Sequence, residues 1–133
     1  MNSALSIFIV TALILAGVFG TGFWLSRLGA PYGAILFNLH KLIGVGAGAF
    51  LGILVSGVNK TTPLQPGQTA AVVVAAIFFV LTIVAGGLVS VLATGGLSTL
   101  SPKLQYAISI AHQMLPYPTV LSFVAVLYLL FGK

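Results

Sequence analysis

Apolar residues fill four long stretches of the chain, and short segments rich in Gly, Pro, Ser and Thr separate them. The stretches cover roughly residues 4–25, 31–58, 69–93 and 102–131. A helix needs about 20 mainly apolar residues to cross roughly 30 Å of hydrocarbon, so each stretch is long enough to span a bilayer. Short connections make neighbouring helices antiparallel. The pattern therefore predicts an all-α integral membrane protein, with a single domain over residues 1–133 that forms an up-down-up-down four-helix bundle.

Composition strengthens this prediction and excludes several functions. Of the 133 residues, 59% are hydrophobic and 4% are charged, and none is Asp, Glu or Cys. The five cations stand singly, so the chain has no basic row to neutralise nucleic-acid phosphates, and the lipid bilayer is the expected partner. Without carboxylates or thiolates there is no Ser-His-Asp triad, no carboxylate proton relay and no cysteine metal site. We expect an electron-transfer or accessory protein and not a stand-alone enzyme.

The two histidines of the chain are predicted to lie at the same depth. His40 follows Pro31 by nine residues and His112 follows Pro102 by ten, and both prolines are expected to begin helices that run in the same direction. Each histidine then lies about 14 Å from the same face, on helices that are diagonal in the bundle and about 12 to 14 Å apart. This spacing leaves room for a flat macrocycle held between the two imidazoles, which is the geometry of a bis-histidine haem. A hydrogen bond from each histidine to a neighbouring helix is the alternative interpretation.

Small residues follow the first histidine on its own helix face. Gly44, Gly48 and Gly52 recur every four residues, so a porphyrin could lie close to the backbone there. Stripes of this kind are also typical of helix-helix contact in membranes, and the glycines alone favour that interpretation. In the last span, Pro116 removes the hydrogen bond to the His112 carbonyl and predicts a kink.

Two cations are candidates for binding an anion. Lys41 lies next to His40 within a span, where a charge costs about 2.5 to 3.5 kcal/mol on insertion scales. Because the chain has no acidic side chain, a haem propionate, a lipid phosphate or an acid of another subunit would have to pair with it. Arg27 is expected near the same face as a further candidate for this role. A lysine that extends to the membrane interface is the alternative.

Residues 21–42, TGFWLSRLGAPYGAILFNLHKL, and residues 110–130, IAHQMLPYPTVLSFVAVLYLL, carry a resemblance. They are similar to small four-span prokaryotic membrane proteins and, more loosely, to the membrane-bound b-type cytochromes. The resemblance implies haem b held by histidines of membrane helices, here His40 and His112, in the inner (cytoplasmic) membrane of a prokaryote. Many of these cytochromes hold two haems with four histidines. A chain with two histidines holds one haem, so electrons would continue to a membrane or soluble redox partner or to a quinone.

Two other functions remain open at this point. The chain could be a non-catalytic accessory subunit that binds lipid or pigment within a larger membrane complex or a homo-oligomer. A small transporter ranks last, because no acidic group is present to couple transport to an ion.

Overall fold

The computed structural model describes residues 3–29 and 31–132, and these residues form helices joined by short connections, with no strand. The helices are α1 (Ser3–Leu28), α2 (Ala34–Thr61), α3 (Pro66–Ala93), α4 (Pro102–Met114) and α5 (Pro116–Phe131). Four spans are long and apolar enough to cross a membrane, because α4 and α5 together make the fourth. The prediction of an all-α, four-span membrane protein is confirmed.

Capping residues and prolines decide where the helices begin, and the start of α2 differs from the prediction. Pro102 is the first residue of α4, and the Ser101 hydroxyl accepts a hydrogen bond of 3.4 Å from the backbone N–H of Leu104. The expectation that Pro31 begins the second span is wrong. α2 begins three residues later, because Gly33 is still extended and occupies the capping position.

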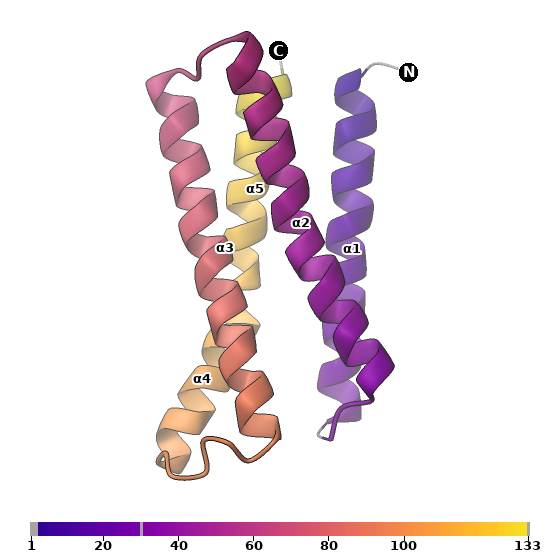
Figure 1. Ribbon diagram of the computed structural model, residues 1–133, viewed down its shortest axis with the longest axis vertical. Helices are drawn as coiled ribbons and strands as arrows, with labels where there is room; N and C mark the ends of the chain where they lie inside the picture. The colour runs from indigo at the N-terminus through magenta and orange to yellow at the C-terminus, as the bar shows by residue number, and fades with distance from the viewer. Residues whose placement is uncertain (1–2, 30, 133) are drawn as a thin grey trace.

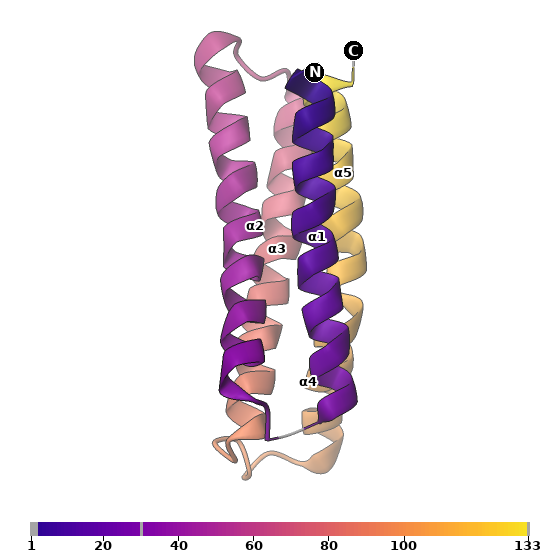
Figure 2. The same cartoon turned by 90° about the vertical axis from the view of Figure 1, so that its right-hand side faces the viewer.

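The spans run alternately down and up in Figures 1 and 2, and both termini lie at the same end. α1 packs against α2, α3 packs against α4 and α5, and α5 also contacts α1 and α2. A cluster of buried side chains lies in the half of the bundle nearer the termini, and it consists of Ala47, Leu51, Ala75, Phe123, Val126 and Leu127. Many large apolar side chains elsewhere on the spans are exposed, as expected for helices that face lipid.

The last span breaks between α4 and α5, as Pro116 predicts. Proline has no N–H to donate to the His112 carbonyl, and α4 bends away from α1 and α2 (Figure 1). Among the described residues, the Cα atoms of α4 come within 8 Å of α3 and α5, but not of α1 or α2. Just beyond the break, the hydroxyls of Thr82 and Thr119 are 2.7 Å apart and join α3 to α5. The break therefore separates the two hairpins at one end of the bundle only.

Gly48 of α2 packs against α3. A Cβ added there would overlap the ring of Phe79, which itself contacts Phe123 in the core with 5.9 Å between ring centroids. We expect Gly48→Ala to destabilise the protein by about 1 to 3 kcal/mol, because the ring must leave its position. The midpoint of thermal unfolding in detergent measures this change.

Gly44→Ala is the matched control, because a Cβ at Gly44 meets nothing within 4 Å. Its midpoint should be unchanged or slightly raised, since alanine is the better helix former. Phe79→Leu should restore part of the loss caused by Gly48→Ala. Equal midpoints for the two glycine variants would contradict this account of the contact.

Candidate functional site

The structure brings the two histidines of the chain together. The ring centroids of His40, on α2, and His112, on α4, are 6.5 Å apart, and their planes make an angle of 82°. Both side chains are half-buried. Since the backbones of α2 and α4 do not approach within 8 Å here, the imidazoles bridge the two hairpins. We call these two residues the histidine pair.

His40 is held by the helix that precedes it. A Cβ at Gly22 of α1 would lie 3.0 Å from Cε1 of His40, so the ring rests where a side chain is missing. Nδ1 of His40 is 3.2 Å from the Val18 carbonyl oxygen and 3.0 Å from the Thr21 hydroxyl. A carbonyl only accepts, so the shared proton belongs to Nδ1. The other ring nitrogen, Nε2, then has a free electron pair.

The Thr21 hydroxyl supports the same assignment. It donates to the Gly17 carbonyl at 2.7 Å, which leaves its oxygen able to accept the hydrogen on Nδ1 of His40. The ring is thus fixed in orientation by two acceptors on α1. In metal sites, a hydrogen bond of this kind to one ring nitrogen orients the other nitrogen as the ligand.

His112 is placed in a similar way by α3. A Cβ at Gly86 would lie 2.8 Å from Cε1 of His112, closer than real Cβ contacts allow. The backbone carbonyl of Thr82, one turn before Gly86, faces the ring. The contact falls short of good hydrogen-bonding geometry, and Nδ1 of His112 is a buried nitrogen without a hydrogen-bond partner in the described part of the chain.

The two hairpins therefore share one local design. In each, a histidine on the second helix rests on a glycine of the first helix, and its Nδ1 faces the carbonyl four residues before that glycine. Val18 and Gly22 serve His40, whereas Thr82 and Gly86 serve His112. This correspondence between the two halves of the chain is what a parallel internal repeat produces.

The sequence interpretation missed Gly22 and Gly86. Both were visible as glycines six or seven residues before the end of the helix that precedes a histidine, at Leu28 and Ala93. A glycine at this place in the first helix of a hairpin leaves room for a histidine of the second helix, and this is the pattern that identifies both residues.

Lys41 has partners that the sequence did not suggest. Its ammonium group lies 4.0 Å from the centroid of the Phe37 ring and donates a hydrogen bond of 3.1 Å to the Ser90 hydroxyl. Ser90 is one turn beyond Gly86 on α3, so the cation lies on the side of α2 that faces the second hairpin. A ring face and a hydroxyl reduce the cost of placing this charge within a membrane span without neutralising it. An external anion can still pair with it.

The other predicted residues differ in their surroundings. Gly44 has open space around it, and Gly48 is covered by Phe79, so Gly48 serves helix packing. Arg27 lies in the last turn of α1, with its guanidinium carbon 5.0 Å from the Phe23 ring centroid. It follows Gly22 by five residues, so it points about 140° away from the face that meets His40.

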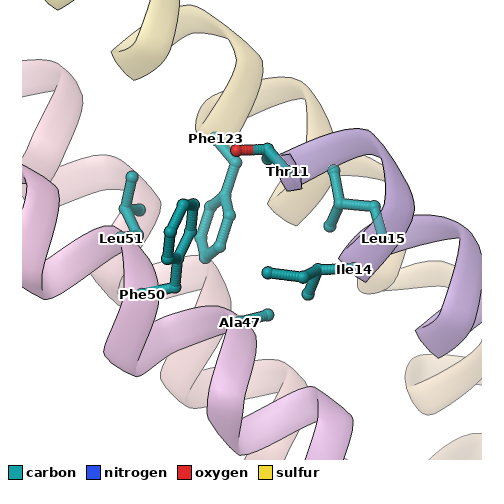
Figure 3. Close-up of a pocket in the computed structure, with 7 residues that line it drawn as sticks. All are labelled: Thr11, Ile14, Leu15, Ala47, Phe50, Leu51 and Phe123. Atoms are coloured by element: carbon teal, nitrogen blue, oxygen red, sulfur yellow. The ribbon is translucent and has the colours of Figure 1, made fainter. Parts of the chain in front are cut away.

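Two hollows of the structure lie away from the histidine pair. One, of about 10 Å³, lies between α1, α2 and α5 and is drawn in Figure 3. Its lining residues are Thr11, Ile14, Leu15, Ala47, Phe50, Leu51 and Phe123. The second, of about 350 Å³, lies on α1. A planar ligand of the histidine pair would therefore have to lie between the hairpins, where α4 diverges from α1 and α2.

The spacing of the imidazoles fits two ligands of one metal ion. A ligating nitrogen lies about 2 Å from a transition metal, and the ring centre lies roughly 1 Å farther, so two opposed imidazoles have centroids about 6 Å apart. The observed separation is 6.5 Å. The described residues contain no group of three or more His, Cys, Asp or Glu side chains that could hold a bare ion. The pair suits a metal that brings its remaining ligands with it, as haem iron does.

Comparisons of the chain with protein-family models, with curated proteins and with solved structures found no match.

Proposed function

We propose that this protein is a membrane-embedded b-type cytochrome that holds one haem between His40 and His112. The 6.5 Å separation of two imidazoles from helices of different hairpins is the observation that carries this proposal. Histidine is uncommon inside membrane spans and is usually functional there. This chain has two histidines, and they lie side by side.

The surroundings of the histidines support a ligand role over a purely structural one. The hydrogen bonds of His40 to Val18 and Thr21 join α2 to α1, as in the alternative interpretation, but they occupy one ring nitrogen. Within the described residues, the hydrogen bonds of His40 run through Nδ1 alone, to Val18 and Thr21, which leaves Nε2 for a metal. Nδ1 of His112 is buried beside a carbonyl that can play the same part.

His40 and His112 would hold the haem, and a haem bound by two histidines would supply one-electron transfer instead of oxygen binding. The residues around it would tune its potential through the hydrogen bonds to Nδ1, through apolar burial and through nearby positive charge. Lys41, adjacent to His40 and without an acidic partner, would attract the haem carboxylates. Electrons would leave to a quinone or to a membrane or soluble redox partner, in the cytoplasmic membrane of a prokaryote.

A visible spectrum of the purified full chain tests the proposal. The protein should be produced in cells supplied with iron and a haem precursor, then recorded before and after reduction with dithionite. We expect a sharp α-band on reduction and close to one haem per chain. A folded, colourless preparation would overturn the proposal and favour an accessory subunit.

The hydrogen bond from His40 to Thr21 gives a finer prediction. Thr21→Val removes one of two acceptors at Nδ1, so the imidazole donates less charge to iron and stabilises the ferric form less. We expect the reduction potential to rise and haem affinity to fall about tenfold, the low end of the range for such changes. Potentiometric titration measures the first effect and haem transfer to apomyoglobin the second.

Thr11→Val is the matched control, because the Thr11 hydroxyl donates only to the Ile7 carbonyl of its own helix, at 2.8 Å. Its potential should equal that of the wild type. If both threonine variants shift the potential equally, Thr21 has no specific effect on the His40 ligand.

A further inference from the structure

A hollow on α1 lies on the face opposite the histidine pair. It is lined by Gly20, Phe23, Trp24 and Arg27, with a volume of about 350 Å³. These positions follow the i, i+3, i+4, i+7 pattern, so they share one helix face. Gly22 and Val18, which meet His40, lie on the other side of the helix. We call this feature the α1 hollow.

The shape of the α1 hollow fits a hydrocarbon chain. A Cβ at Gly20 would have no neighbour within 4 Å, so the missing side chain leaves a gap in the surface. The rings of Phe23 and Trp24 stand beside this gap, and each is 62% exposed. An acyl chain that runs along α1 can lie over the glycine between two aromatic side chains.

The positive charge of Arg27, at one end of the hollow, has no acidic side chain in the chain to pair with. Arg27 is exposed in the last turn of α1, and no Asp or Glu exists in the sequence to pair with it. A second copy of the chain has no acidic side chain either, so self-association cannot supply one. Trp24 lies one turn before Arg27, and tryptophan and arginine near a span end are typical of the headgroup region. A phospholipid brings both the apolar chain and the phosphate to this position.

We propose that the α1 hollow binds an anionic phospholipid, with its phosphate against Arg27 and an acyl chain over Gly20. Guanidinium groups bind phosphate through paired, charge-assisted hydrogen bonds, and the indole N–H of Trp24 can donate as well. The remaining cations at this end of the bundle would face the same leaflet. This site is independent of the histidine pair and does not require haem.

Trp24 provides the probe, because it is the single tryptophan of the chain. The full-length protein is reconstituted in phosphatidylcholine vesicles that contain a small fraction of either brominated phosphatidylglycerol or brominated phosphatidylcholine. Bromine quenches tryptophan on contact, and each sample is compared with the same protein in unbrominated lipid, which cancels quenching by any haem. We expect phosphatidylglycerol to be preferred about fivefold, as for one cation at an anionic membrane surface.

Two variants and one control decide the outcome. Arg27→Gln should abolish the preference, and Gly20→Leu, which fills the hollow, should reduce it. Lys60→Gln removes an exposed cation from the last turn of α2, at the opposite end of the bundle, and should leave the preference unchanged. Equal quenching by the two lipids, or a preference that survives Arg27→Gln, would overturn the proposal. A preference lost in Arg27→Gln but intact in Gly20→Leu would also contradict it, since the hollow would then have no part in binding.

Discussion

Replacing either histidine of the pair with alanine is expected to abolish haem binding. His40 and His112 would each supply one of two axial ligands from separate hairpins, so the loss of one leaves the haem attached to a single helix. Changes to groups that merely support a ligand weaken metal binding by about 10- to 100-fold, and removing the ligand itself should cost more. The reduced α-band should disappear from purified His40→Ala and from His112→Ala.

The controls for this experiment lie on the same helices. Asn38 and Gln113 are exposed polar residues within two positions of a histidine, and their alanine variants should keep the wild-type spectrum. All four variants should retain helical circular dichroism, because the core cluster is at the other end of the bundle. An α-band of wild-type shape and intensity in either histidine variant would contradict the assignment of that residue as a ligand.

The second large effect is expected at Gly86. Its alanine variant places a methyl group 2.8 Å from Cε1 of His112, so the imidazole must move away from α3. Overpacking of this kind destabilises a structure by about 1 to 3 kcal/mol, and here the side chain that must move is His112, the proposed haem ligand. We expect Gly86→Ala to lose most of its haem while it remains folded. Gly22→Ala, with a 3.0 Å contact to His40, should show a smaller loss in the same direction.

Gly87→Ala is the matched control, since a Cβ at that position meets nothing within 4 Å. This variant adds the same methyl group to α3, one residue after Gly86. Haem content per folded chain is measured by the pyridine haemochrome method and circular dichroism, and it should be lower in Gly86→Ala than in Gly87→Ala. Equal haem content in Gly86→Ala and Gly87→Ala would show that the contact between Gly86 and His112 does not position a ligand.

Hydropathy and length were sufficient to predict the four spans. Apolar runs of 25 residues or more have few other stable arrangements in a bilayer, where every backbone group must be satisfied within its own helix. The helix boundary at Pro31 was harder to predict, because proline is compatible with both a helix start and an extended turn. Gly33, extended just before Ala34, decided between them, and a single glycine gives no such information in advance.

The candidate site was predictable in part. Similar spacing from two prolines, nine and ten residues, identified the histidines as a pair, although Pro31 does not begin its helix, and their close approach agrees with that interpretation. The glycines that hold the rings could not be found in this way, because nearly uniform apolar spans do not reveal which face meets another helix. The same limit applies to Lys41, whose partner Ser90 lies 49 residues away in the sequence. The rotation of each helix about its axis decides which face meets another helix, and packing between helices sets that rotation.

The electron paramagnetic resonance spectrum of the oxidised wild-type protein tests the central claim most directly. Two histidine ligands would make the ferric iron low-spin, and if the 82° between the ring planes is kept when haem binds, the signal would be strongly anisotropic with one very large g value. We predict this signal at low temperature, with an intensity close to one haem per chain. A high-spin ferric signal would show that the two histidines do not both bind the iron, and the absence of any haem signal from folded protein would contradict the account as a whole.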